Sequence, residues 1–116
     1  MNRRLTRTDR LKTRGDLTRV FREGRSAADA ALRLLVLPNS LGRRRVGVAV
    51  SVRHGGAVRR NRVKRLCREA FRACRDELPD GCDFVLQPRP GRDHSIEALC
   101  RSLRGLSRRL AGEGRP

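Results

Sequence analysis

Residues 57–78 combine an apolar stripe with a dense set of cations, and this segment restricts the fold more strongly than any other. The apolar side chains recur at the three- and four-residue steps of a helix surface; they are Val63, Leu66, Cys67, Ala70, Phe71, Cys74 and Leu78. The cations on the opposite arc are Lys64, Arg65, Arg68, Arg72 and Arg75. Glu69 is the single acid between Ala57 and Arg75. The pattern predicts one helix over 57–78 that packs on a sheet and presents cations to a polyanion.

Three short apolar segments predict β-strands. Residues 31–37 and 46–52 are separated by the turn-forming Pro38-Asn39-Ser40, so we expect these two strands to pair antiparallel, and residues 82–87 form a third strand. In the second segment every even position is valine, whereas the odd positions are glycine, alanine and serine. One face of this strand is therefore core. The nearly bare other face has room either for a closely packed helix or for a ligand lying across the sheet.

Two further helices flank these elements. The first spans Asp16–Arg22, begins at Thr13 or Gly15 and ends near Gly24. Its apolar side carries Leu17, Val20 and Phe21. The last begins at Ser95, a plausible N-cap, and its apolar side carries Ile96, Leu99, Cys100, Leu103, Leu106 and Leu110. The order of elements predicts a single α+β domain over residues 1–116 with an interior βαβ connection and flexible ends at about 1–9 and 111–116.

The charge balance favours nucleic acid as the partner. The chain has 29 Lys and Arg against 12 Asp and Glu, a formal net charge of +17, which a polyanion would neutralise. The main rival is an anionic membrane surface, but the chain has no Trp or Tyr and only three Phe as anchors. It also lacks an apolar run of the roughly 18–20 residues that span a membrane. We therefore expect a cytoplasmic protein without a membrane partner.

The cysteines and histidines do not form a recognisable metal or catalytic motif. Cys67, Cys74, Cys82 and Cys100 lack the close Cys-x-x-Cys spacing of common zinc sites, so they are interpreted as reduced structural thiols, with structural zinc through Cys82 or a histidine as the alternative. His54 and His94 have no partner spacing that marks a catalytic triad.

The acidic residues also give no sign of a protein active site. Asp76, Glu77, Asp80 and Asp83 cluster where the long helix ends, and we expect them to balance local arginines rather than to hold a catalytic metal. No catalytic and no metal-binding residue is therefore predicted.

The motifs resemble those of the bacterial ribonuclease P protein component. The resemblance is centred on Arg60-Asn61-Arg62 followed by Lys64-Arg65, within the run Arg53–Arg72. It extends upstream to Arg45–Ser51, and to Arg10-Leu11 with Asp16–Gly24, so it covers most of the chain in order.

This resemblance implies both a fold and a function. The fold is a two-layer α/β sandwich with a mixed sheet of about four strands, three helices and a left-handed βαβ crossover, as in the second domain of a small-subunit ribosomal protein. The function is that of a basic subunit that joins a catalytic RNA, the pair removing the 5′ leader of precursor transfer RNA by hydrolysis. The RNA performs the chemistry with Mg²⁺ held mainly by the RNA and the substrate phosphates. DNA is not an expected partner.

The resemblance also implies two sets of contact residues. The set that contacts the catalytic RNA is Arg53, Arg59, Arg60, Asn61, Arg62, Lys64, Arg65 and Arg68. The set that lines a cleft for the single-stranded leader, between the first helix and the open sheet face, is Leu17, Phe21, Leu35, Gly47, Ala49 and Ser51. Leu17 and Leu35 stand where relatives often have aromatics, and Phe21 is either a cleft residue or ordinary core.

Two alternatives share much of this pattern. A structural RNA-binding protein of the ribosomal type would have the same charge and fold class but no processing activity. A self-sufficient nuclease would cleave without an RNA partner.

Overall fold

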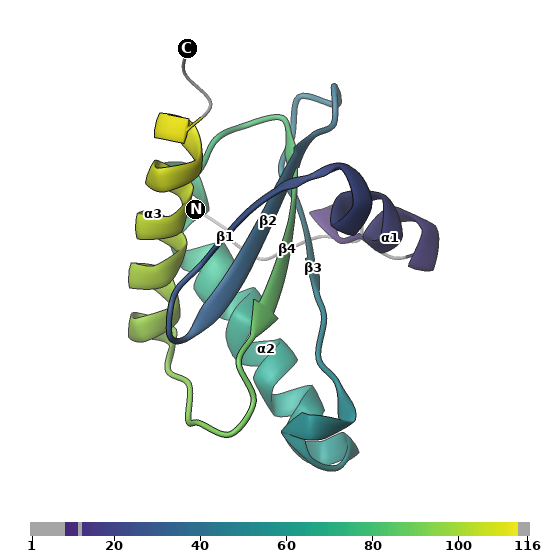
Figure 1. Cartoon of the computed structure of the whole chain (residues 1–116), viewed down its shortest axis with the longest axis vertical. Helices are drawn as coiled ribbons and strands as arrows, with labels where there is room; N and C mark the ends of the chain where they lie inside the picture. Colours follow the sequence, from purple (N-terminus) through teal and green to yellow (C-terminus); the bar gives the residue numbers. More distant parts are fainter. Residues whose placement is uncertain (1–8, 12, 114–116) are drawn as a thin grey trace.

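The chain forms a four-stranded sheet with helices on both faces, and the computed structural model describes residues 9–11 and 13–113 (Figure 1). The elements are α1 (Arg14–Glu23), β1 (Arg25–Ala28), β2 (Leu32–Pro38), β3 (Arg45–Val48), the 3-10 turn η2 (Val52–His54), α2 (Ala57–Cys74), the 3-10 turn η3 (Arg75–Glu77), β4 (Cys82–Pro88) and α3 (Ile96–Glu113). The strand order across the sheet is β1-β2-β4-β3. The predicted α+β class, a mixed sheet with three helices, is confirmed.

Strand β4 lies between β2 and β3, which corrects one prediction. β2 pairs antiparallel with β4, and β3 pairs parallel with β4. The expected antiparallel pairing of residues 31–37 with 46–52 is therefore wrong. Six of the seven residues of β4 are buried, all except Gln87, and a central strand covered on both faces is where such a segment is stable.

The connection from β3 through α2 to β4 is left-handed. In Figure 1, α2 lies behind the sheet, β3 and β4 both run downward, and β4 lies to the left of β3. A right-handed connection, which is the usual one, would place β4 on the other side of β3. The handedness agrees with the expectation from the family resemblance.

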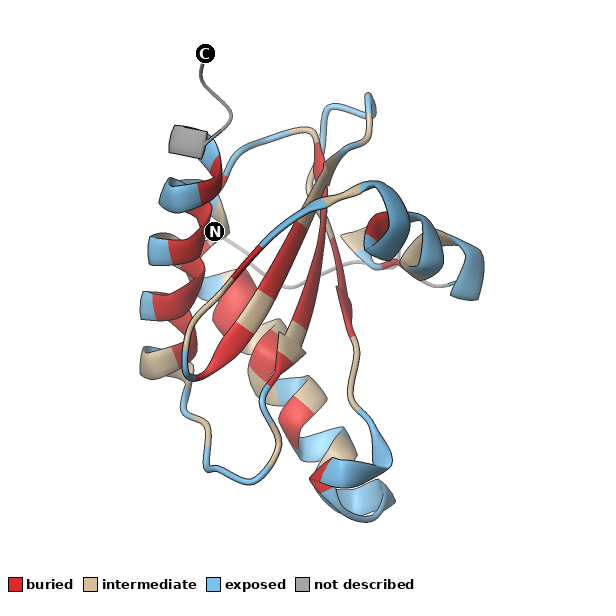
Figure 2. Cartoon of the chain, viewed as in Figure 1, coloured by how far each residue is buried: buried red, intermediate tan, exposed pale blue. Residues whose placement is uncertain are grey.

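Helices α2 and α3 cover one face of the sheet and enclose the main core (Figure 2). At its centre, Phe71 of α2 and Phe84 of β4 are fully buried with their ring centroids 5.3 Å apart. The predicted apolar faces of both helices are confirmed, because each predicted position is buried except Leu66 and Ile96, which are partly buried and pack against the core. The broad face of α2 therefore supports the sheet, and its remaining surface is available to a partner.

Helix α1 covers part of the opposite face. It contributes Val20 to a second, smaller cluster of buried residues that also contains Leu11, Leu35 and Val85. The hydroxyl of Thr13 accepts a hydrogen bond from the Asp16 backbone N–H at 3.0 Å, and Gly24 ends the helix. The predicted helix and both of its ends are confirmed.

Strand β3 is shorter than predicted. It ends at Val48, because the Ser51 hydroxyl accepts from the backbone N–H of Arg53 at 3.2 Å and caps the turn η2. The alternation of buried valines therefore fails at Val52, which is 79% exposed.

The long helix also ends earlier than predicted. α2 stops at Cys74 and the chain continues as η3 to Glu77. Asp76 and Glu77 would place two carboxylates at the negative end of a longer helix, which is unfavourable.

Strand β1 differs from the sequence analysis, whereas the flexibility of the chain ends stays a prediction. β1 was not predicted, because Arg-Ser-Ala-Ala has little apolar alternation; the Asp29 carboxylate shapes the turn after it by accepting from the backbone N–H groups of Ala31 and Leu32, both at 2.9 Å. Of the predicted flexible ends, residues 1–8 and 114–116 lie outside the described residues. Asp9 forms a salt bridge with Arg75, and α3 begins at its predicted cap, Ser95, and continues to Glu113.

None of the described helices combines the length and apolarity needed to cross a membrane.

Candidate nucleic-acid interface

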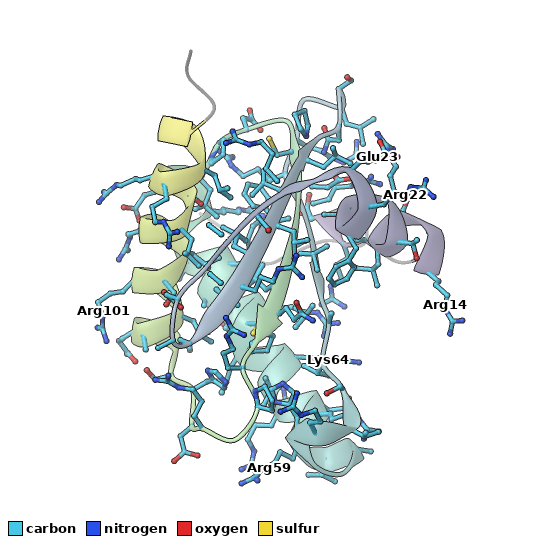
Figure 3. The ribbon with its side chains drawn as sticks, viewed as in Figure 1. Arg14, Arg22, Glu23, Arg59, Lys64 and Arg101 are labelled. Carbon is cyan, nitrogen blue, oxygen red and sulfur yellow. The ribbon has the colours of Figure 1, made fainter. Side chains whose placement is uncertain are left out.

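The start of α2 and the neighbouring turn η2 carry cations without acidic partners. Within residues 9–11 and 13–113, none of the seven predicted RNA-binding cations forms a salt bridge. Apart from Arg60 and Arg68, which have other neighbours, they are Arg53, Arg59, Arg62, Lys64 and Arg65. We call these five residues the α2 cationic surface. Figure 3 shows Arg59 and Lys64 projecting from α2. The first turn of α2 contains no acid, so the positive end of the helix dipole adds to the same field. Asn61 lies exposed among these cations.

The other half of α2 is different, because its arginines are paired. Arg72 forms a salt bridge with Glu69, one helical turn away. Arg75, just beyond the helix, lies 3.6 Å from the carboxylate of Asp9. Uncompensated charge is therefore concentrated at the N-terminal half of α2, which the sequence pattern alone did not distinguish from the rest.

Arg60 has a structural contact in addition to its predicted role. Its guanidinium donates a hydrogen bond to the backbone carbonyl of Gly55 at 2.9 Å, and the side chain is half-buried. This bond closes the Gly55-Gly56 turn onto the first turn of α2. The contact between Arg60 and RNA stays a prediction. The hydrogen bond to Gly55 already fixes part of the Arg60 side chain.

Arg68 lies near another cation. Burial and then the nearby charge of Arg10 lower the pKa of Arg68. Arg10 and Arg68 therefore repel each other, and an anion bound between them would reduce this repulsion. Arg10 was not among the predicted RNA contacts, and its proximity to Arg68 depends on the tertiary fold.

Part of the predicted leader cleft is filled by protein. A Cβ at Gly47 would lie 2.6 Å from Leu17 Cδ2 and 3.2 Å from Leu11 Cβ, so the bare strand face accommodates a closely packed helix at this position. Leu35 is only 1% exposed, in the cluster on the same face. Of the two interpretations of the bare face, helix packing is correct at Gly47. Leu35 therefore lies in the second cluster and Leu17 packs against it, so a contact of either side chain with a leader stays a prediction.

Just beyond the end of β3, Ala49 and Ser51 line an open cavity of about 350 Å³. Arg33 and Gln87, which are register partners on β2 and β4, line it as well, and their side chains approach to 3.4 Å. Sequence reasoning missed both residues, although an arginine inside the apolar run 31–37 was a signal for an outward-facing position. The open part of the sheet face therefore lies at the η2 end of β3.

Phe21 does not belong to the core. Its side chain is 37% exposed, whereas its neighbour Val20 is fully buried. The core interpretation is therefore wrong. Phe21 is also not among the residues that line the cavity at Ala49, so a contact between Phe21 and the leader stays a prediction.

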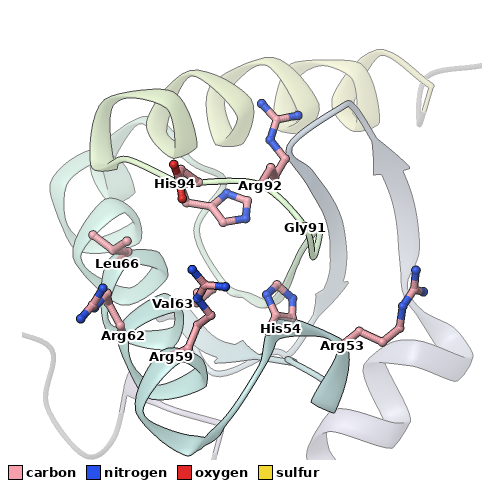
Figure 4. Close-up of a pocket in the computed structure, with 10 residues that line it drawn as sticks. Arg53, His54, Arg59, Arg62, Val63, Leu66, Gly91, Arg92 and His94 are labelled. Carbon is pink, nitrogen blue, oxygen red and sulfur yellow. The ribbon is translucent and has the colours of Figure 1, made fainter.

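A second cavity, of about 500 Å³, lies beside the start of α2 (Figure 4). His54 and His94 line it with their ring centroids 6.5 Å apart, and we call it the histidine pocket. Arg59 and Arg62 line it from α2, and Arg92 from the loop before α3. Arg53 and His54 line both cavities, which are therefore adjacent. The sequence analysis gave no role to Arg92 or to either histidine.

The cysteines are placed as structural thiols. All four are buried and unpaired, and burial raises the pKa of both Cys67 and Cys74 to about 12.

The acids near the end of α2 also bind arginines as expected: Asp83 with Arg45 at 2.7 Å, Glu77 with Arg104 at 2.9 Å and Asp80 with Arg44 at 3.8 Å. The described residues contain no group of three or more potential metal ligands.

The whole chain is similar to proteins of one family. The family model described as Ribonuclease P matches residues 5–111. The ribonuclease P protein component of Pelotomaculum thermopropionicum is 48% identical over 81 residues, which cover 70% of this chain and 72% of the relative. That of Thermotoga petrophila is 34% identical over 117 residues, which cover 97% and 100%.

Solved structures agree with this assignment. The ribonuclease P protein from Thermotoga maritima superimposes with a TM-score of 0.75 at 32% identity, covering 86% of this chain and 96% of that one. A Staphylococcus aureus ribonuclease P protein gives a TM-score of 0.73 at 28% identity, covering 89% and 94%. With matching sequence over nearly its full length and the same fold, the chain belongs to the family of ribonuclease P proteins, the protein subunits of a ribonucleoprotein endoribonuclease.

Proposed function

We propose that this chain binds the catalytic RNA of ribonuclease P through the α2 cationic surface. The observation that carries the proposal is the concentration of four unpaired cations in the N-terminal half of α2, next to Arg53 in η2, on a helix whose other face is fixed in the core. Arginine binds phosphate oxygens in a two-pronged geometry, and a rigid helix holds these groups at fixed spacing along an RNA backbone. Asn61, which both donates and accepts hydrogen bonds, is suited to a base edge or a ribose in the same contact.

We further propose that the 5′ leader of precursor transfer RNA crosses the sheet at the cavity of Ala49 and Ser51. The small side chains there leave the strand surface accessible, and Arg33 offers a planar guanidinium on which an unstacked base can rest. Arg53 borders both this cavity and the histidine pocket. It therefore stands between the proposed leader path and the proposed catalytic RNA contact.

In this proposal the protein positions RNA and the RNA cleaves it. Mg²⁺ supplies the electrophilic and nucleophile-activating chemistry, and it is held by RNA and substrate phosphates, the oxygen ligands that it prefers. The contribution of this chain is to neutralise phosphates and to increase affinity for substrates that carry a leader. We place this activity in the cytoplasm, without a DNA or membrane partner.

A reconstitution that omits one component at a time tests the proposal. The full chain, the catalytic RNA and a precursor transfer RNA are mixed with Mg²⁺, and leader release is measured. We expect the protein to stimulate cleavage only when the catalytic RNA is present. Cleavage without that RNA would identify a self-sufficient nuclease, and RNA binding without stimulation would identify a structural RNA-binding protein.

A matched pair of variants then tests the surface. Arg62→Ala combined with Arg65→Ala removes two unpaired cations of α2, and Arg101→Ala combined with Arg108→Ala removes two exposed arginines of α3. We expect the α2 pair to weaken binding of the catalytic RNA at least tenfold more than the α3 pair. Equal losses would mean that net charge, and not the α2 cationic surface, determines binding.

A further inference from the structure

Three segments converge on the histidine pocket. Arg53 and His54 come from η2, Arg59 and Arg62 from the first turns of α2, and His94 from the loop between β4 and α3. Figure 4 shows the rings of His54 and His94 on the same cavity as the guanidinium of Arg59. The loop from residue 89 to 95 therefore forms a wall opposite the α2 cationic surface.

Both imidazoles are fixed by backbone carbonyls. The Nε2 atom of His54 lies 2.9 Å from the Pro88 carbonyl oxygen, and that of His94 lies 2.9 Å from the Arg89 carbonyl oxygen. A carbonyl oxygen only accepts, so each Nε2 carries the hydrogen. Among the described residues, neither Nδ1 atom has a hydrogen-bond partner, although His54 is only 7% exposed.

The lining of the pocket is cationic and carries no large aromatic. Four arginines and two histidines line it, and Asp93 is the single acid among the described lining residues. Nothing in the lining offers a Tyr, Trp or Phe ring for a base to stack on, so the chemistry suits a phosphate better than a nucleobase. The start of α2, with no acid in its first turn, borders the same cavity.

We propose that the histidine pocket binds a backbone phosphate of the catalytic RNA between Arg59 and Arg62 on one side and His94 on the other. Because Nε2 of His94 is engaged by the Arg89 carbonyl, the ring holds the phosphate as the imidazolium, which donates from Nδ1. This inference rests on the proposed function and extends the RNA contact beyond α2 to the loop before α3. The catalytic RNA is the favoured source of the phosphate because the pocket shares Arg53, Arg59 and Arg62 with the α2 cationic surface. The carboxylate of Asp93, which lines the same pocket, then repels the phosphate and weakens binding of the RNA.

The test is a gain of affinity. Asp93 is exposed and forms no salt bridge within the described chain, so Asp93→Asn should leave the fold unchanged. We expect this variant to bind the catalytic RNA about two- to fourfold more tightly than the wild type at low salt, the size of a single surface charge effect. Asp76→Asn in η3 makes the same change in net charge away from the pocket. The proposal is overturned if the two variants bind equally.

A loss variant and a crosslink complete the test. His94→Gln keeps a donor for the Arg89 carbonyl but lacks the second ring nitrogen, and we expect it to weaken RNA binding. A photo-crosslinker on a thiol introduced by Asp93→Cys is tested with the catalytic RNA alone, with the precursor alone and with both. It should react with the catalytic RNA whenever that RNA is present. Crosslinking to the precursor alone would overturn the assignment. If the wild type fails to bind the catalytic RNA at all, the proposed function fails; if it binds but Asp93→Asn gives no gain, this inference alone fails.

Discussion

Arg45 and Asp83 face each other across the parallel pair of β3 and β4 and form a two-pronged ion pair. Arg45 Nε lies 2.8 Å from one carboxylate oxygen of Asp83, and the second guanidinium nitrogen lies 2.7 Å from the other. Asp83 is 2% exposed, and the Asn39 amide donates to it as well, at 2.8 Å. The contact joins β3 to β4, the two strands that α2 connects, and so it helps to fix the position of α2.

Asp83→Asn should destabilise the fold. It leaves the Arg45 guanidinium half-buried without its charged partner, and removal of one member of a buried pair is costly. Because Arg45 keeps some contact with solvent, we expect a loss of about 2–3 kcal/mol in the free energy of unfolding, measured by urea denaturation. Asp80→Asn is the matched control, since the Asp80 side chain is 63% exposed and lies 3.8 Å from Arg44. Equal losses in the two variants would contradict this account.

The same pair predicts how stability depends on pH. Burial alone would raise the pKa of Asp83, but the hydrogen bonds from Arg45 and Asn39 outweigh it and hold the pKa below its usual value of 3.8. A carboxyl whose pKa is lower in the folded state contributes stability that is complete above the unfolded value and is lost as the pH falls through the folded value. We expect the free energy of unfolding to fall below about pH 4. In Asp83→Asn the acid-induced fall should be smaller, and an unchanged fall would refute the assignment.

Gly47 tests the packing of α1 on the sheet. Gly47→Ala would place a Cβ 2.6 Å from Leu17 Cδ2, and we expect a loss of about 1–3 kcal/mol from overpacking. Leu17→Ala removes the clashing group, so the double variant should lose less stability than the sum of the two single variants. Urea denaturation of all four proteins measures this coupling. Additive losses would mean that the two side chains do not compete for one space.

The sequence predicted the elements better than their arrangement. The apolar stripes located the core faces of α2 and α3, because a helix face is a local property of the sequence. The pairing of strands is not local. Residues 31–37 and 46–52 are neighbours in sequence, yet β4 separates them, because Cys82, Phe84 and Leu86 are buried in the main core and Val85 in the second cluster. The left-handed crossover came from the family resemblance, since periodicity contains no information on handedness.

In the candidate site, too, the sequence predicted the residue types, whereas their contacts depend on the tertiary fold. Charge and spacing identified the cations of α2, but only the fold shows that Arg72 and Arg75 are paired while Arg62 and Arg65 are not. The bare strand face left helix and ligand as open alternatives; a helix occupies it at Gly47, and an open cavity follows, for which a ligand stays a prediction. Leu17 covers Gly47, and the surface opens two residues later at Ala49.

The four thiols should be inert in the folded protein. The thiolate is the reactive form, and burial raises the pKa of Cys67 and Cys74 to about 12. We expect the native protein to react slowly with a disulfide reagent at pH 8 and to expose all four thiols in urea. Arg108→Cys, at an exposed site on α3, provides a rapidly reacting control. Rapid reaction of any native thiol before unfolding would contradict the observed burial.

The α2 cationic surface should be visible in the salt dependence of RNA binding. Each neutralised phosphate contributes about −0.7 to −0.9 to the slope of log affinity against log salt concentration, because counterions are released. Arg62→Ala and Arg65→Ala should each make the slope shallower by about that amount, since neither side chain has an acid to neutralise it within the described chain. Arg72→Ala is the informative comparison, because Arg72 is already paired with Glu69, and we expect its slope to match that of the wild type. Equilibrium binding of the catalytic RNA at several salt concentrations measures all four slopes. If Arg72→Ala changed the slope as much as Arg62→Ala, the ion pair with Glu69 would not persist in the complex, and the cationic surface would extend along the whole helix.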